Sequence, residues 1–263
     1  MQVATNVEKA GAFRAMHQPG NPIVLINVWD VASARAVAAQ AGTQAIATAS
    51  WSICAANGFA DGGELPPEVA LAAAKRIVEA TELPVTVDFE KGYADSAAGV
   101  RENVLCLIET GAIGLNMEDS IGADDGALWS VSEAAARVAA VRAAAEESGV
   151  PLVINARTDT LAGRGTVEDA IERGRAYLDA GADCVFVLGA NLANTADIVR
   201  GIPGPVSVIG GATTPTIAEF AEMGVARISF GPGPMGVAYA ALARLVNDLA
   251  AGKPQSPDLA YRP

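Results

Sequence analysis

Residues 111–119, GAIGLNMED, contain the pattern that is most informative about the fold of this chain. A glycine that can end a helix is followed by a short apolar run typical of a buried β-strand, and the run ends in two acidic residues. The same succession of glycine and strand recurs after Gly42, Gly181 and Gly224. A repeat of this kind predicts strands that alternate with helices.

Eight runs of the chain, this one included, have the composition of buried strands. They span residues 23–28, 44–50, 84–90, 112–118, 151–157, 183–188, 205–210 and 226–231. Stretches rich in Ala, Leu, Glu and Arg, which favour helix, separate them. Eight β-then-α units predict a single-domain (β/α)₈ TIM-type barrel over residues 1–252, with a C-terminal tail at 253–263. An open, doubly wound sheet is the main alternative, although eight units favour closure.

Composition narrows the possible functions. The 263 residues are 51% hydrophobic, which is enough for one large core, and 30 acidic against 18 basic residues give a net charge of −12. An acidic chain lacks the basic surface that binds nucleic acid. The chain has three cysteines, Cys54, Cys106 and Cys184, and no two of them form a CxxC pair. No run of residues predicts a signal peptide or a membrane span. We therefore expect a cytoplasmic protein. His17 is the single histidine, which predicts chemistry without imidazole.

Polar residues gather where the second to fifth predicted strands end. In chain order they are Ser50, Trp51, Ser52, Asp88, Glu90, Asn116, Glu118, Asp119, Arg157 and Asp159. The carboxyl ends of the strands of a barrel meet at one mouth, where active sites of this fold lie. We therefore expect a site on one side of the mouth.

The acidic members of this set predict a metal. Asp88 and Glu90 share one face of their strand, Glu118 ends the next strand, and Asp61 follows the second strand in the loop NGFADGG. Such carboxylates repel each other unless a cation balances them, and oxygen ligands suit Mg²⁺ or Mn²⁺. The alternative is that each acid is a helix N-cap or a first-turn charge that interacts with the helix dipole, which is our interpretation of Asp119 and Asp159.

Two other features predict anion binding. Arg157 can clamp a substrate carboxylate or phosphoryl group, or pair with Glu118, and the two roles are compatible. Ser50, Trp51 and Ser52 lie at a bend whose backbone N–H groups can hold an anion, although Trp51 alone would more often serve packing. The match to GxGxxG at residues 231–236 contains two prolines, which lack N–H donors, and it does not predict a dinucleotide site.

Several of these strings together resemble the isocitrate lyase/phosphoenolpyruvate mutase superfamily. The matching strings, in the family's order, are NVWDVASARAVAAQAG, IATAS, NGFADGG, VDFEKGY, GLNMED and INARTD. The resemblance implies a (β/α)₈ barrel, a homotetramer, Mg²⁺ at the strand ends, and small 2-oxo or 2-hydroxy acid substrates that react through a metal-bound pyruvate enolate. It implies that Asp88 is the direct metal ligand and that three other acids hold metal-bound water, namely Asp61, Glu90 and Glu118. It also implies that Ser50 and Trp51 offer backbone N–H groups to the substrate.

The residues and the resemblance lead to one set of assignments. We assign metal binding to Asp88, Glu90 and Glu118, catalysis to Asp61, Glu118 and Arg157, and substrate binding to Ser50, Trp51, Ser52, Asn116 and Arg157.

Two departures from the family's pattern select the reaction. Residues 120–130, SIGADDGALWS, lack the Lys-Lys/Arg-Cys-Gly-His loop of the isocitrate and methylisocitrate lyases, and Leu188 stands where the phosphonomutases tend to carry His. We therefore expect a lyase or decarboxylase that cleaves a bond to C3 of a small 2-oxo acid. Phosphonomutase-type P–C bond chemistry and a catalytically silent, metabolite-binding barrel are the alternatives.

Overall fold

The computed structural model describes residues 5–122, 126–163 and 165–260. Its strands are β1 (Ile23–Leu25), β2 (Asn27–Val28), β3 (Ile46–Thr48), β4 (Val85–Asp88), β5 (Gly114–Glu118), β6 (Val153–Thr158), β7 (Cys184–Val187), β8 (Val206–Ile209) and β9 (Arg227–Ser229). Its helices are α1 (Asn6–Ala15), α2 (Val31–Ala38), α3 (Ser50–Asn57), α4 (Pro67–Val78), α5 (Ala97–Glu109), α6 (Val131–Ser148), α7 (Val167–Asp179), α8 (Thr195–Gly201), α9 (Ile217–Glu222) and α10 (Gly233–Ala250), followed by the 3₁₀ turn η1 (Pro257–Leu259).

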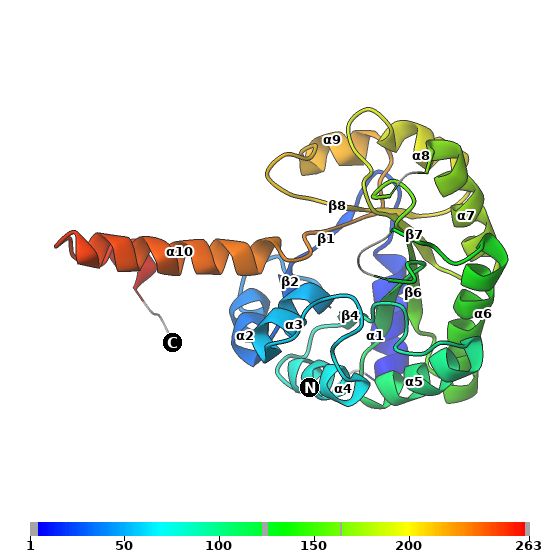
Figure 1. The fold of residues 1–263 in the computed structure, drawn as a ribbon, viewed down its shortest axis with the longest axis horizontal. Coiled ribbons are helices and arrows are strands. Elements are labelled where there is room, and N and C mark those ends of the chain that lie inside the picture. The colour runs from blue at the N-terminus through cyan, green and yellow to red at the C-terminus, as the bar shows by residue number, and fades with distance from the viewer. Residues whose placement is uncertain (1–4, 123–125, 164, 261–263) are drawn as a thin grey trace.

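The strands form a nearly closed parallel barrel, which confirms the predicted fold class (Figure 1). The sheet order runs β1-β9-β8-β7-β6-β5-β4-β3-β2, and every pairing is parallel. Strands β1 and β2 are separated only by Ile26, so together they are one predicted strand that pairs with β9 on one side and β3 on the other. Pairing of the first strand with the last excludes the open sheet.

Gly111, Gly181 and Gly224 directly follow the C-caps of α5, α7 and α9, as predicted, whereas Gly42 lies in the turn beyond α2, which ends at Ala38. Gly42, Gly111, Gly181 and Gly224 have φ angles of +92°, +90°, +103° and +87°, a region that favours glycine. Helix starts are also set locally, because α1, α2, α6, α7 and α9 each begin with a reciprocal capping box.

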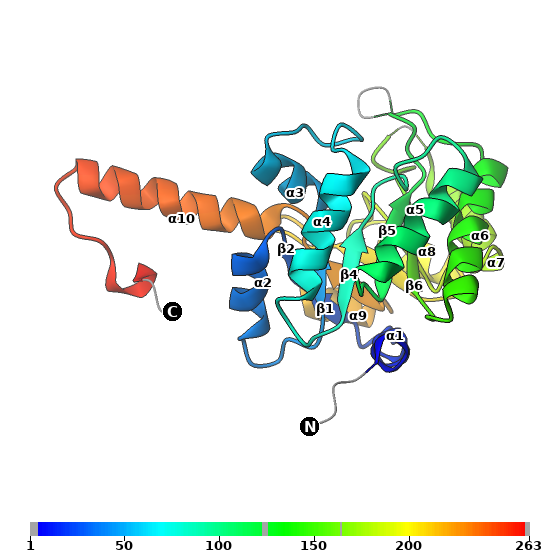
Figure 2. The ribbon, with the colours of Figure 1, turned by 90° about the horizontal axis from the view of Figure 1, so that it is seen from below.

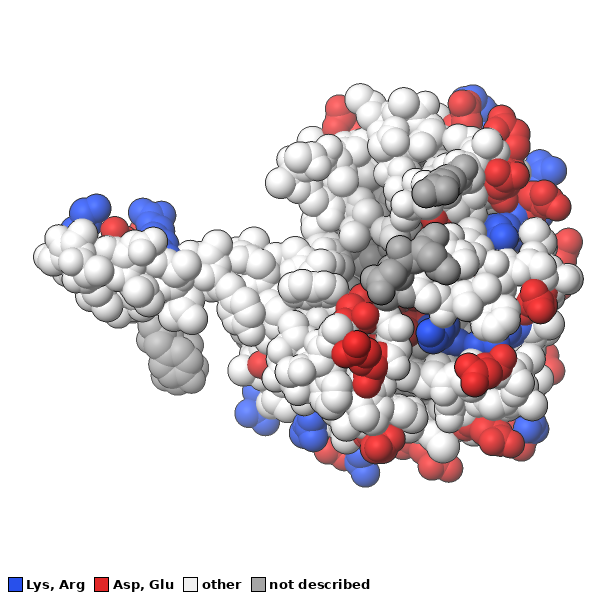
Figure 3. All heavy atoms as spheres, in the orientation of Figure 1, with Lys and Arg blue, Asp and Glu red and all other residues white. Residues whose placement is uncertain are grey.

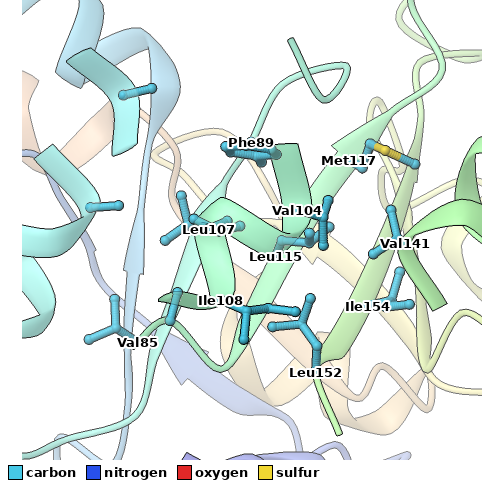
Figure 4. Packing of buried hydrophobic residues seen from close by; sticks show 14 of the residues in the cluster. Val85, Phe89, Val104, Leu107, Ile108, Leu115, Met117, Val141, Leu152 and Ile154 are labelled. Carbon is cyan, nitrogen blue, oxygen red and sulfur yellow. The ribbon is translucent and has the colours of Figure 1, made fainter. Parts of the chain in front are cut away.

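The apolar core lies in two places. Between the strands and the surrounding helices, residues such as Phe89, Leu107 and Ile154 pack together (Figure 4). Inside the barrel, Phe13 of α1 packs against Leu25, with Ala45 and Ala47 in the same cluster, at the end opposite the predicted mouth. The strand ends and the loops that follow them therefore form the mouth.

Helix α10 departs from the regular pattern. It follows the last strand but projects away from the barrel instead of packing on its flank (Figures 1 and 2). Several large apolar side chains on it are more than half exposed: Val237, Leu242, Val246 and Leu249. The predicted boundary between the barrel and a tail at residue 252 remains a prediction. No helix in the described part of the chain is long and apolar enough to cross a membrane.

Candidate active site

Asp88, at the end of β4, is held by the turn that starts α3. Its Oδ2 accepts hydrogen bonds from the Ser50 backbone N–H and from Ser50 Oγ, both at 3.0 Å. The Asp88 N–H donates to Thr48 Oγ1 at 2.9 Å, which ties the strand ends together. The Ser50 N–H group therefore already serves Asp88, and its expected role toward a substrate carboxylate remains a prediction.

Glu90 lies just beyond Asp88 in an unusual backbone conformation. It has a φ of +45°, and its side chain is buried with 2% of the residue exposed. Glu90 Oε1 accepts from Tyr93 Oη at 2.9 Å and from the Cys54 thiol at 3.8 Å, whereas Oε2 has no partner among the described residues. Ligand atoms of Cys54, Asp61 and Glu90 lie within 4.8 Å of one another.

This acidic cluster favours protonation in the absence of a cation. Burial, followed by the charges of Asp61 and Asp88, raises the pKa of Glu90 to about 7, although the Tyr93 hydrogen bond opposes the shift. Burial of its carboxyl within the cluster and the Asp88 charge raise the pKa of Asp61, even though that residue as a whole remains exposed to solvent. Burial and the Glu90 charge also raise the pKa of the Cys54 thiol to about 12.

A hard divalent cation fits this donor set. The unpartnered Glu90 oxygen is buried beside other carboxylates, and a cation there would stabilise their ionised forms. Carboxylate oxygens are the ligands that Mg²⁺ and Mn²⁺ prefer. Because Cys54 is a neutral thiol that donates to Glu90, the cluster offers oxygen ligands in preference to sulfur.

Arg157, on β6, forms a second charged group at the mouth. It pairs with Glu118 of the adjacent strand through Nη1 at 2.9 Å, and with Asp159 through Nε and Nη2 at 2.6 and 2.8 Å. Its guanidinium also lies over the Phe186 ring, 5.8 Å from the centroid. Burial disfavours the cation, but Glu118 and Asp159 outweigh that effect and raise the pKa of Arg157.

Glu118, which pairs with Arg157, has a carboxyl pKa near neutrality. Burial raises the pKa of Glu118 to about 7, while Arg157 opposes the shift and Asp159 adds to it. Ser120 Oγ also donates to Glu118 Oε1. A carboxyl poised in this range can hold or release a proton at neutral pH.

Two adjoining cavities open at the mouth and share Asp61 and Arg157. The inner cavity, of about 170 Å³, is lined by Asn27, Ala49, Ser50, Trp51, Asp61, Asp88, Asn116, Arg157, Phe186, Leu188, Ile209, Ser229, Gly231 and Pro232. The outer cavity, of about 230 Å³, is lined by Asp61, Gly62, Lys91, Glu118, Ser120, Ile121, Gly122, Gly126, Leu128, Arg157, Asp159, Ala162 and Gly163. Figure 3 shows acidic and basic side chains next to each other near the centre of this face.

The structure therefore brings most of the assigned residues together. Ser50, Trp51, Asp61, Asp88, Asn116, Glu118 and Arg157 line the cavities, and Glu90 is buried beside them. Ser52 does not line either cavity, since it lies on the buried side of α3. Of the loop 120–130, residues 123–125 lie outside the described part of the chain.

The helix-cap interpretation of Asp119 and Asp159 is wrong. Asp119 is buried and accepts from Thr158 Oγ1, Tyr177 Oη and Arg173 Nη1 at 2.8, 2.6 and 3.1 Å. Asp159 pairs with Arg157. Neither partnership could be inferred from local spacing, because a cap and a buried ion pair both place an acid directly after a strand.

Other cavity residues had no assigned role. Phe186, Leu188 and Ile209 give the inner cavity an apolar wall, and Lys91 lines the outer one, where it donates to the Ile121 carbonyl at 2.9 Å. The one feature of the sequence that points to these residues is their position at or next to the end of a predicted strand. Apolar strand ends are unremarkable in a buried barrel, so that signal was weak.

Comparison with known proteins gives a consistent result. A family model described as phosphoenolpyruvate phosphomutase matches residues 13–250. The structure of a proposed phosphonomutase of Burkholderia cenocepacia is 47% identical, covers 92% of this chain and 99% of its own, and has a TM-score of 0.87.

Two named lyases are also similar to this chain. A structure of 2,3-dimethylmalate lyase, described as a member of the PEP mutase/isocitrate lyase superfamily, is 28% identical over 96% of this chain and 92% of its own, with a TM-score of 0.84. The 2-methylisocitrate lyase of Escherichia coli is 36% identical over 183 residues, which are 66% of this chain and 60% of that enzyme.

Proposed function

The chain belongs to the isocitrate lyase/phosphoenolpyruvate mutase superfamily, and from that premise we propose that it is a Mg²⁺-dependent lyase or decarboxylase. Its substrate is a small 2-oxo or 2-hydroxy acid, in which a bond to C3 is cleaved. The observation that carries the proposal is the inner cavity, where Asp61, Asp88 and Arg157 converge beside an apolar wall.

Asp88, Glu90 and Glu118 are the residues proposed to hold the metal. When bound, Mg²⁺ would supply the positive charge that attracts the carboxylate and carbonyl oxygens of a 2-oxo acid and stabilises negative charge developing there. Mn²⁺ has similar ligand preferences and could replace it.

The chain's own residues would orient the acid and control protons. Arg157 has N–H groups beyond those given to Glu118 and Asp159, and these can bind an anionic group of the substrate. Ser50, Trp51 and Asn116, which line the inner cavity, are the other proposed substrate-binding residues, whereas Ser52, which the sequence also suggested, lies outside both cavities. With pKa values raised above their usual range, Asp61 and Glu118 are suited to hold or move a proton next to the cavity.

The wall of the inner cavity favours carbon–carbon over carbon–phosphorus chemistry. Leu188 and Phe186 are apolar, and a phosphoryl group in transit needs hydrogen-bond donors or cations around its oxygens. Phosphonomutase chemistry is the second candidate, supported by the 47% identity with the proposed phosphonomutase. A silent metabolite-binding barrel is the third.

A product analysis distinguishes these functions. The purified protein is incubated with Mg²⁺ and, separately, with oxaloacetate, 2-methylisocitrate stereoisomers, 2,3-dimethylmalate or phosphonopyruvate, and products are identified by NMR. Cleavage of one of the first three that is lost in Asp88→Asn but retained in Asp179→Asn, an exposed acid at the end of α7, supports the proposal. Formation of phosphoenolpyruvate from phosphonopyruvate would instead establish the mutase function.

We also propose that the chain forms a homo-oligomer, a tetramer by the family resemblance. The exposed apolar side chains of α10 have no cover in one copy, and Figure 3 shows the part of this helix near the barrel free of charge. Val24 and Ile26, which flank Leu25 and point out of the barrel beside β9, are only half-buried. The α10 helix of a second copy would cover both surfaces.

Cytoplasmic location is proposed as well. It is supported by free cysteines at positions 54, 106 and 184, which suit a reducing compartment.

A further inference from the structure

Arg227 is a charged residue enclosed in the barrel interior. It lies on β9 and is fully buried, and among the described residues it has no carboxylate within ion-pairing distance. Its guanidinium lies 5.8 Å from the centroid of Phe13, which closes the far end of the barrel. Its one hydrogen bond in the described chain runs from Nη2 to Asn116 Oδ1 at 2.9 Å, while Nε and Nη1 have no partner there.

This hydrogen bond determines which way the Asn116 amide faces. Guanidinium nitrogens only donate, so the Asn116 atom next to Arg227 must be the oxygen. The same Oδ1 accepts a second hydrogen bond, from Asn155 Nδ2 at 2.9 Å. With the oxygen occupied twice, the Asn116 NH₂ group is left over, and it has no hydrogen-bond partner among the described residues.

Asn116 also lines the inner cavity together with Asp88 and Arg157. We infer that Arg227 is a positioning residue, which holds the Asn116 amide with its NH₂ group toward the inner cavity so that it donates to an oxygen of the bound acid. This inference rests on the proposed function, because it takes the ligand to be a small carboxylate or 2-oxo acid.

A purely structural role explains Arg227 poorly. A buried cation without a carboxylate partner pays a desolvation cost, and apolar residues of similar volume often replace such groups with no loss of stability. Burial lowers the pKa of Arg227 to about 10, so the group remains charged at neutral pH. By contrast, Arg142 has structural partners: it pairs with Asp183 at 2.7 Å and donates to the Gly181 carbonyl.

The test is a double-mutant cycle with oxalate as the probe. Binding of oxalate in the presence of Mg²⁺ is measured by calorimetry for wild type, Arg227→Met, Asn116→Ala and the double variant, and thermal unfolding is followed for each. Each single substitution should weaken binding about tenfold, and the double variant should bind no more weakly than Asn116→Ala alone. Arg227→Lys, which keeps a donor, should recover part of the affinity.

Arg142→Met is the matched control, and it should lower the unfolding temperature while leaving oxalate affinity unchanged. Wild-type affinity in Arg227→Met, or additive losses in the double variant, would overturn the inference. Failure of the wild type to bind oxalate would count against the proposed function instead. In that case a neutron crystal structure of Arg227→Met, which distinguishes the amide nitrogen from the oxygen, decides: an Asn116 amide that has turned or populates two orientations supports the inference, and an amide whose oxygen still accepts from Asn155 overturns it.

Discussion

Arg157 and Asp159, two residues apart at the end of β6, form a two-point ion pair through Nε and Nη2 at 2.6 and 2.8 Å. Asp159 thereby fixes the plane of the guanidinium, and Nη1 reaches Glu118 on the neighbouring strand. The arginine is thus oriented before any ligand arrives, with two of its five N–H groups unused by these acids.

Arg157→Ala should abolish substrate binding and also reduce stability. Removing the guanidinium leaves two half-buried carboxylates without their cation, which should lower the free energy of unfolding by about 3 kcal/mol. Urea unfolding and ligand calorimetry measure the two effects, and Arg157→Lys should keep much of the stability but little of the two-point geometry. Intact ligand affinity in Arg157→Ala would mean that the arginine only balances Glu118 and Asp159.

Asp88→Asn should reduce the affinity for Mg²⁺ by at least about tenfold without unfolding the barrel, because neutralising one ligand weakens a site built from carboxylates. Isothermal titration with Mg²⁺ and with Mn²⁺ measures the change. Asp179→Asn, at the opposite end of the barrel, should bind like wild type. Equal affinities in wild type and Asp88→Asn would contradict the metalloenzyme assignment.

Leu242→Glu combined with Val246→Glu should convert an oligomer into monomers, because both side chains are 58% exposed on α10 and a charge there opposes burial in an interface. Light scattering coupled to size-exclusion chromatography gives the mass. Leu192→Glu, which changes a leucine outside α10 that is 66% exposed, should leave the assembly intact. A wild type that is monomeric at micromolar concentration would rule out the proposed assembly.

His17 should make stability depend on pH in the acid range. Burial and the Arg227 charge lower the pKa of His17 from 6.5 to about 4, while its Nδ1 hydrogen bond to the Phe13 carbonyl opposes the shift. The unfolded chain therefore binds a proton between these values that the folded chain does not. Stability is fully present above pH 6.5 and is lost as the pH falls toward 4, by up to about 3 kcal/mol.

Urea unfolding of wild type and His17→Gln between pH 4 and 8 measures this effect. Carboxylates titrate equally in both proteins, so the difference between the two curves isolates the histidine. The difference should change with pH below 6.5 and be flat above it, and a flat difference throughout would show that His17 does not titrate abnormally.

Much of the fold and part of the site could be predicted because the relevant signals are local. Strand periodicity, helix caps and the glycines at 42, 111, 181 and 224 depend on neighbours in the chain, and parallel strand ends necessarily meet at one mouth. Asp88, Glu118 and Arg157 were found in this way. Glu90 and Asp61 were placed in the same acidic cluster from their positions after the predicted strands. Only the division of these acids into a direct metal ligand and residues that hold metal-bound water came with the family resemblance, since spacing alone does not separate the two.

The (β/α)₈ barrel, the edge at which the polar groups gather and the surplus of acids that favours a cation all follow from local sequence patterns. How those groups pair becomes visible in the folded chain alone. The fold buries Asp119 with Tyr177, sends α10 away from the barrel, and joins Arg227 to Asn116 across 111 residues of chain. The physical reason is that local conformation depends on adjacent residues, whereas the partner of a buried polar group is set by which distant strands the closed barrel places together.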